Sequence, residues 1–329
     1  MRSTVFRFSA AILLLAAPFA AEAQQAGKVY RVGYLSAGSC ETQDPVVQAL
    51  LRGLIGRGWI EGQNLIVERR SAEGKNERLP ALAAELVQRK VDVIVAVADA
   101  AALAAKETTK SVPVVMLLVG DPVGSKLVAS LARPGGNVTG MTFTPTLELL
   151  GKRLALLKEA VPHASRVAIL SNPANPSHVR ELKALQAAAG PLRLQGHHLE
   201  ARSPEEFARA FTAMRRERAE ALLILVDSMF TIHRTRLAEL AAAYRLPTLY
   251  GIREFVVAGG LMAYGVNVVD YAEGAASYVD RILKGARAGD LPVEQPTKFE
   301  LVINLKTARR LGLTIPPSLL VRADQVISE

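Results

Sequence analysis

Polar and aromatic side chains follow several apolar runs that we interpret as buried β-strands. Open parallel sheets bind their ligands at the carboxyl ends of the strands. A carboxylate at such an edge can hold a ligand ammonium, a hydroxyl or free helix N–H groups can hold a ligand carboxylate, and a tyrosine can stack on a ring. The candidate ligand-binding residues selected by this rule are Ser36, Ala37, Asp99, Gly120, Asp121, Asn172, Asp227, Tyr250 and Tyr264.

These candidates divide by the ligand group that each could hold. Ser36 is the leading candidate for a carboxylate, together with the backbone amides of 100–102, where a helix is predicted to begin. Asp227 and Asp121 are candidates for an ammonium group. The two tyrosines are candidates for stacking, and Phe143 is a candidate wall of the cleft.

Each candidate also has a purely structural interpretation. Asp227, Asp121 and Asp99 stand at strand-to-helix turns, where aspartate commonly caps the helix. Ser36 could form a loop, and the tyrosines could pack at a hinge. Asn175 is expected to cap the helix that follows it. The residue types alone leave these alternatives open.

No catalytic or metal-binding motif accompanies the candidates. None of the five histidines has a carboxylate or cysteine at ligand spacing, and the chain has no G-x-S-x-G or Walker A sequence. Gly53-x-x-Gly56-x-Gly58 stands at a predicted helix end, so it is not a dinucleotide fingerprint. We therefore expect a binding protein and not an enzyme, without metal or cofactor.

The elements that must position the candidates alternate in type. Short aliphatic runs such as 92–98 predict strands, and 3.6-residue periodicity such as that of 46–57 predicts helices. Strands that are apolar on both faces indicate a parallel sheet covered by helices. A further helix is predicted over 123–132, ended by Arg133-Pro134-Gly135-Gly136.

The two halves of the chain repeat a pattern. R-V-G-Y-L-S ends at Ser36 and R-V-A-I-L-S ends at Ser171. Downstream, Asp92 and then Glu220 are each followed by six apolar residues and an aspartate. The repeat predicts two similar α/β halves with a ligand cleft between them, which Ser36 and Ser171 face from opposite walls.

Length and composition agree with two lobes. The chain has 329 residues, more than one core usually holds, and half of them are hydrophobic. Its net charge is +9, but the basic residues are spread along the chain among acidic ones. No run of basic residues is interleaved with aromatic residues, so we expect no nucleic-acid partner.

The N-terminus resembles a secretory leader. Arg2 and Arg7 precede the apolar run 10–17 and the small-x-small site 21–23, which predicts a signal peptide over residues 1–23. Cys40 is the only cysteine, so we expect no disulfide. It does not stand directly after the cleavage site, where a lipoprotein has its acylated cysteine, so we expect no lipid anchor. The predicted location is the periplasm.

Several longer motifs resemble one family, the substrate-binding proteins of ABC transporters that include tryptophan- and tyrosine-binding members. The motifs are Gly120-Asp121-Pro122-Val123-Gly124, the segment 131–140 (L-A-R-P-G-G-N-V-T-G), Gly151-Lys152-Arg153-Leu154, Asn172-Pro173-Ala174-Asn175-Pro176, Arg253-Glu254-Phe255, the segment 259–265 (G-G-L-M-A-Y-G) and the segment 291–304. The resemblance covers essentially the whole chain after the predicted leader. Asp99 departs from it, because the family tends to have a small or hydroxyl residue there.

This resemblance implies a type I periplasmic-binding-protein fold, with two Rossmann-like lobes joined by a three-crossover hinge. The lobes are expected over 28–141 plus 268–292 and over 142–267 plus 293–329, with crossovers near 140–144, 265–269 and 292–298. It also implies hinge closure on an amino-acid-like or aromatic metabolite, followed by delivery to an ABC permease with a separate ATPase. We expect a monomer. The alternative is a periplasmic sensor that presents a bound small molecule to a membrane signalling partner.

Overall fold

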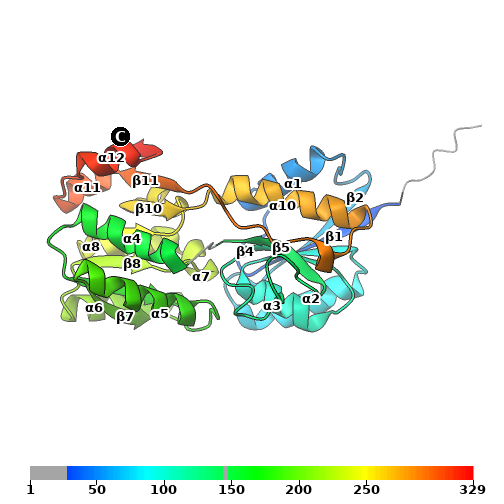
Figure 1. The fold of residues 1–329 in the computed structure, drawn as a ribbon, viewed down its shortest axis with the longest axis horizontal. Coiled ribbons are helices and arrows are strands. Elements are labelled where there is room, and N and C mark those ends of the chain that lie inside the picture. Colours follow the sequence, from blue (N-terminus) through cyan, green and yellow to red (C-terminus); the bar gives the residue numbers. More distant parts are fainter. Residues whose placement is uncertain (1–27, 144–146, 329) are drawn as a thin grey trace, which may run out of the picture.

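The computed structural model describes residues 28–143 and 147–328. The signal peptide predicted over residues 1–23 lies outside the described residues. Two α/β lobes lie side by side, each built on its own sheet (Figure 1). Within the two described ranges, no helix is both long enough and apolar enough to cross a membrane.

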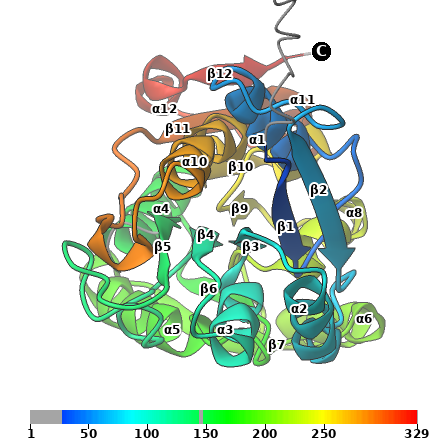
Figure 2. The same ribbon diagram turned by 90° about the vertical axis from the view of Figure 1, so that its right-hand side faces the viewer.

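The first lobe is a parallel sheet with helices on both faces. Its strands are β1 (Tyr30–Ser36), β2 (Leu65–Ser71), β3 (Val93–Val97), β4 (Val114–Val119) and β5 (Val138–Thr142), and its helices are α1 (Pro45–Ile55), α2 (Leu79–Gln88), α3 (Asp99–Thr108) and α10 (Val268–Leu283). The strand order is β2-β1-β3-β4-β5, and all pairs are parallel. Val32 and Tyr34 share a core cluster with residues of α1 and α10, and Leu35 shares another with residues of α2 and α3. Figure 2 shows these two pairs of helices on opposite sides of the sheet. Both faces are thus buried, as the continuous apolar strands predict.

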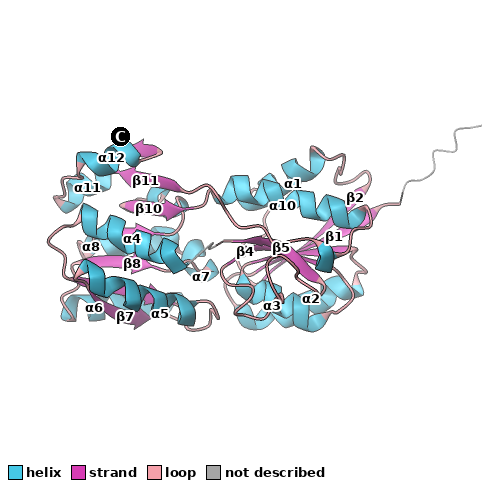
Figure 3. Ribbon diagram, in the orientation of Figure 1, coloured by secondary structure: helices cyan, strands magenta, loops and turns pink. Residues whose placement is uncertain are grey.

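The second lobe has a larger sheet. Its strands are β6 (Arg166–Ser171), β7 (Gln195–Glu200), β8 (Ala221–Ile224), β9 (Thr248–Tyr250), β10 (Met262–Gly265), β11 (Glu300–Asn304) and β12 (Gln325–Ile327). Its helices are α4 (Leu147–Ala160), α5 (His178–Ala189), α6 (Phe207–Arg216), α7 (Ser228–Ile232), α8 (Arg234–Ala243), α9 (Glu254–Val257), α11 (Leu305–Leu311) and α12 (Pro317–Arg322). The order is β12-β11-β10-β9-β8-β6-β7, with helices on both faces (Figure 3).

One pair in this sheet, β10 with β11, is antiparallel. The connectivity explains the exception. The chain leaves β10 toward the first lobe, where it forms α10, and returns through 292–299 into β11. The chain leaves β10 and enters β11 at the same end of the sheet, the end that faces the first lobe, so β11 runs in the opposite direction to β10.

The chain passes between the lobes three times, so the predicted three-crossover hinge is present. The passages join β5 to α4, β10 to α10, and the short 3₁₀ helix η4 (Ala288–Asp290) to β11. The first and third run together, because the Thr142 N–H donates to the Glu294 carbonyl at 2.9 Å.

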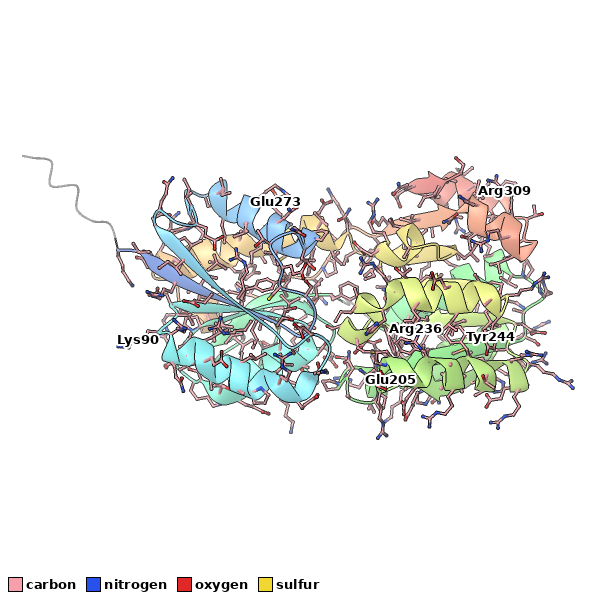
Figure 4. All side chains as sticks on the ribbon, turned by 180° about the vertical axis from the view of Figure 1, so that it is seen from behind. Lys90, Glu205, Arg236, Tyr244, Glu273 and Arg309 are labelled. Carbon is pink, nitrogen blue, oxygen red and sulfur yellow. The ribbon has the colours of Figure 1, made fainter. Side chains whose placement is uncertain are left out.

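Helices distant in sequence meet closely where α1 packs on α10. A Cβ on Gly53 would lie 2.5 Å from the Glu273 carbonyl oxygen, so only glycine allows this approach. Arg52 Nε of α1 lies 3.9 Å from the carboxylate of Glu273 of α10. Glu273 is labelled in Figure 4. Gly53 of the glycine-rich motif therefore serves helix packing.

Two helix predictions were wrong. No helix forms over 123–132: the N–H groups of Leu127 and Val128 both reach the Pro122 carbonyl, and Lys126 adopts a left-handed φ of 58°, which ends the helical path after one turn. Asn175 does not cap the helix that follows it as predicted, because its side chain accepts the Ser177 N–H in a turn and α5 begins only at His178. Helices α7, α8, α9 and α12 were not predicted.

Candidate functional site

A cavity of about 300 Å³ lies between the lobes. The first lobe contributes the ends of β1 and β3, the start of α1, and Leu118. The second lobe contributes Phe143, Asn175, the segment from Val226 into α7, and the turn after β9. The lining residues are Tyr34, Ser36, Gly38, Ser39, Asp44, Pro45, Val46, Val97, Ala98, Asp99, Leu118, Phe143, Asn175, Val226, Asp227, Ser228, Thr231, Ile232, Arg234, Ile252, Glu254 and Val268.

The β1–α1 turn forms one wall of the cavity. Ser36 ends β1 and is buried, and its Oγ accepts the Gly38 N–H at 3.0 Å. That bond uses the oxygen as an acceptor and leaves the hydroxyl proton available to donate. Asp44 caps α1 through the Val46 and Val47 N–H groups at 2.9 and 3.4 Å.

The β3–α3 turn presents a buried carboxylate to the cavity. Ala98 has a left-handed φ of 78°, which directs the chain sharply from β3 into α3. Asp99 follows at the start of the helix and is 5% exposed. It accepts the Gly120 N–H at 3.1 Å and the Ser177 hydroxyl at 2.5 Å. Burial raises the pKa of the Asp99 carboxyl, and these two hydrogen bonds oppose that shift.

Asp227 organises the facing wall. Its Oδ1 accepts the Met229 and Phe230 N–H groups at 3.0 and 3.4 Å, which makes it the N-cap of α7. The Asn172 side-chain amide donates to the same oxygen at 3.2 Å, and the Asn175 amide donates to Oδ2 at 3.1 Å. The capping interpretation of Asp227 is therefore correct, and the carboxylate lies on the cavity wall at the same time.

A buried histidine that the sequence did not suggest supports this wall. The Asn172 N–H donates to His178 Nδ1 at 2.9 Å. His178 Nε2 then donates to the Val226 carbonyl at 3.0 Å. His178 thus ties the turn after β6 to the residue that precedes Asp227.

The remaining predicted site residues lie away from the cavity. Ala37 is buried in the first-lobe core, and Gly120 supplies its N–H to Asp99. Asn172 donates to Asp227. Asp121 forms an ion pair with Arg180, in an interlobe contact.

The tyrosines serve packing. Tyr250 stacks on Phe255 with ring centroids 4.5 Å apart, and Tyr264 lies beside Phe299 at 6.0 Å. The buried Arg153 Nε donates to the Tyr264 carbonyl at 2.8 Å, and burial lowers the pKa of Arg153 to about 10.

Ser171 does not face the cavity, contrary to the prediction from the repeat. Its hydroxyl lies 2.7 Å from His198 Nε2 on the neighbouring strand β7. The two copies of the strand therefore end in the same residue type but use it differently.

Apolar side chains complete the cavity. Phe143, predicted as a wall, lines it together with Val97, Leu118 and Ile252. Ile252 and Glu254 lie just beyond Tyr250, so the strand-end rule would have found them if it had been extended by a few residues. Among the described residues, Glu254 Oε2 is buried without a hydrogen-bond partner, and burial raises the pKa of this carboxyl.

The charged lining of the cavity is mainly acidic. Four carboxylates, those of Asp44, Asp99, Asp227 and Glu254, stand against one guanidinium, that of Arg234. Such a lining, combined with an apolar wall, suits a small molecule that carries a hydrogen-bond donor and an apolar group.

Comparisons with known proteins agree with this architecture. The family model for ABC transporter substrate binding proteins matches residues 36–327. The tyrosine-binding protein of Clostridioides difficile (strain R20291) is 24% identical over 270 residues, covering 82% of this chain and 77% of that protein.

Solved structures extend the similarity. A conserved domain protein from Vibrio cholerae O1 biovar El Tor superposes with a TM-score of 0.86 at 28% identity, covering 91% of this chain and 100% of that one. An ABC domain from Streptococcus pneumoniae in complex with L-Trp gives 0.84 at 26% identity, covering 91% and 99%.

Two parallel-dominated sheets flanked by helices define a type I periplasmic-binding-protein fold, shared with neighbours such as a leucine binding protein from Thermotoga maritima. The chain belongs to the family of ABC transporter substrate binding proteins.

Proposed function

We propose that this protein is the solute-binding component of an ABC importer and that it encloses one small molecule in the interlobe cavity. The observation that carries this proposal is a cavity of about 300 Å³ with walls from both lobes. A site divided between two hinged lobes couples ligand binding to closure. The lobes in this proposal comprise 28–141 plus 268–292 and 142–267 plus 293–329.

The ligand we propose is an amino acid with an aromatic or large apolar side chain. The names of two relatives support this class, since one binds tyrosine and another was solved with L-Trp. Phe143, Leu118 and Ile252 provide an apolar surface for the side chain. Ser36 provides a hydroxyl donor for the carboxylate.

The acidic lining provides for the ammonium group. Of the predicted site residues, we propose Ser36, Asp99 and Asp227 as ligand contacts, because these three line the cavity. Gly120 and Asn172 act through them, since both donate hydrogen bonds to the carboxylates.

Membership of the family supports a cellular role. We propose export through the signal peptide to the periplasm, action as a monomer without cofactor or catalysis, and delivery of the ligand to a membrane permease powered by a separate ATPase. Deletion of the gene for this protein should then reduce the uptake of labelled L-tryptophan or L-tyrosine by intact cells. Deletion of the permease gene should give the same defect.

Ligand binding is tested by thermal shift and calorimetry with L-tryptophan and L-tyrosine. Tryptamine and indole-3-propionate serve as comparisons, since each lacks one of the two charged groups. Ligand at 100 times its dissociation constant should stabilise the protein by about 2.7 kcal/mol, which corresponds to a rise in Tm of roughly 5 °C. If all four compounds bind with equal affinity, or if none of them binds, the proposal of an amino-acid site is contradicted.

The two serines of the sequence repeat provide a matched pair of variants. Ser36→Ala should weaken binding at least tenfold, or about 1.4 kcal/mol, because it removes a cavity hydroxyl. Ser171→Ala makes the same change at the corresponding strand end outside the cavity and should leave the affinity unchanged. Equal effects of the two substitutions would remove Ser36 from the site.

A further inference from the structure

Two polar contacts join the lobes along one side of the cleft. The Ser177 hydroxyl in the second lobe donates to Asp99 Oδ1 in the first lobe at 2.5 Å. Nearby, the Arg180 guanidinium forms an ion pair with Asp121. Ser177 and Arg180 stand at the start of α5, while Asp99 begins α3 and Asp121 follows β4.

The first-lobe segment 120–124 is shaped to receive the start of α5. A Cβ on Gly120 would lie 3.1 Å from Ser177 Oγ, so the backbone approaches Ser177 closely. A Cβ on Gly124 would overlap the Arg180 guanidinium. The Gly124 N–H donates to Asp121 Oδ1 at 2.8 Å, which holds the carboxylate so that its other oxygen meets Arg180.

Two glycines of the first lobe also approach the second lobe. Gly38 lies against Ser228, and Gly74 lies against Met229 and Ile232 of α7. These are van der Waals contacts. Among the residues that the structure describes, Arg180–Asp121 is the only ion pair that crosses from one lobe to the other.

We propose that Asp99–Ser177 and Asp121–Arg180 form an interlobe latch that stabilises the closed arrangement and thereby sets the ligand affinity. Asp121 and Arg180 do not line the cavity, so this half of the latch acts without touching the ligand. The observed affinity equals the intrinsic affinity of the closed form reduced by the fraction of molecules that are closed. The effect on affinity depends on the proposed binding function, whereas the effect on lobe spacing does not.

The charge pair is the part of the latch that can be altered cleanly. Arg180 is half exposed and Asp121 is 29% exposed, so loss of the pair should alter the affinity by two- to fivefold. Arg180→Gln removes the charge and keeps most of the side chain. Gly124→Ala places a methyl group against both the Arg180 guanidinium and the Asp121 carboxylate and leaves both charges in place. Arg209→Gln is the matched control, since Arg209 pairs with Glu206 inside the second lobe.

The experiment measures lobe spacing and affinity separately. Spacing is taken from small-angle scattering and from spin-label distances between the lobes in ligand-free protein, with Cys40→Ser as the background. Affinity is the dissociation constant for L-tryptophan. Arg180→Gln and Gly124→Ala should shift the distances toward a more open form and weaken binding two- to fivefold, with smaller effects in 1 M salt because the pair is solvent-accessible.

A charge exchange decides whether the pair itself is responsible. The double variant Asp121→Arg, Arg180→Asp should recover most of the lost affinity and the closed spacing, while Arg209→Gln should match the parent. The latch is overturned if Arg180→Gln matches the parent in both measurements, or if the exchange restores neither. If L-tryptophan does not bind at all, the ligand proposal fails and the lobe distances alone decide the latch.

Discussion

Replacing Asp227 with alanine should destabilise the protein more than loss of an ordinary helix cap. The carboxylate accepts two backbone N–H groups of α7 and two side-chain amides, those of Asn172 and Asn175. Alanine removes all four acceptor contacts. The two asparagines are 3% and 8% exposed, so their side-chain amides depend on this carboxylate as an acceptor.

The expected magnitude follows from these contacts. Loss of the cap costs about 1 kcal/mol. Each buried amide left without its acceptor adds about 1 kcal/mol. The sum is about 3 kcal/mol of unfolding free energy for Asp227→Ala. Asp44→Ala is the matched control, because Asp44 caps α1 through two N–H groups with no buried amide on its carboxylate, and it should cost about 1 kcal/mol.

Urea unfolding followed by circular dichroism measures both variants without any ligand. The diagnostic quantity is the difference between them, about 2 kcal/mol, since the loss of a cap is common to both. Equal losses would show that the asparagine amides find other partners, and the account of Asp227 as the organiser of its wall would be refuted. A full loss in Asp227→Ala that is mostly recovered in Asp227→Asn would show that the oxygen acceptor matters more than the charge.

Three further predictions test other parts of the structure. Hydrogen bonds from Ser165 and Arg166 lower the pKa of Glu220 from its ordinary value of 4.5 to about 2, so the stability that Glu220 contributes is present above pH 4.5 and is lost as the pH falls toward 2. Glu220→Gln should therefore cost about 1 kcal/mol of unfolding free energy at pH 7 and much less at pH 2.5, as measured by urea unfolding. Gly53→Ala should cost about 1–3 kcal/mol through overlap with α10, whereas Gly56→Ala, with no neighbour closer than 3.5 Å, should be nearly neutral in the same assay. Tyr250→Phe should leave the dissociation constant of L-tryptophan within twofold in calorimetry, because Tyr250 stacks on Phe255 and does not line the cavity; a tenfold loss would place it in the site.

The fold could be predicted because its determinants are local. Strands such as β3 and β4 are apolar throughout, and caps such as Asp44 directly precede their helices. The predicted helix over 123–132 failed because apolar spacing does not reveal a left-handed residue such as Lys126. The short helices around the cavity, such as α7, hold too few residues to show periodicity.

The site was only partly predictable, because position at a strand end does not determine what a side chain contacts. Ser36, Asp99 and Asp227 line the cavity, whereas Tyr250 and Tyr264 at equivalent ends turn into the second lobe. Whether a side chain meets the ligand, a capped helix or the other lobe depends on how the lobes face each other, and a strand pattern carries no such information.

At the amino ends of the strands, the repeated residues have the same structural role in both lobes. In the first lobe the Arg31 N–H donates to Asp92 at 2.8 Å, and in the second the Arg166 N–H donates to Glu220 at 3.0 Å. Each acid precedes one strand and anchors the start of the strand beside it, so the repeat preserves a device that builds the sheet.

At the carboxyl ends the two copies diverge. Ser36 lines the cavity, and the turn after it leads to Gly38, which lies near Ser228 of the second lobe. Ser171 pairs with His198, and the turn after it is held by His178. The shared acids at the amino ends are thus structural. At the carboxyl ends the shared aspartates, Asp99 and Asp227, both line the cavity, but only one of the two shared serines does. Exchanging the turn after β1 should therefore change which ligand binds, whereas exchanging the paired acids should change stability alone.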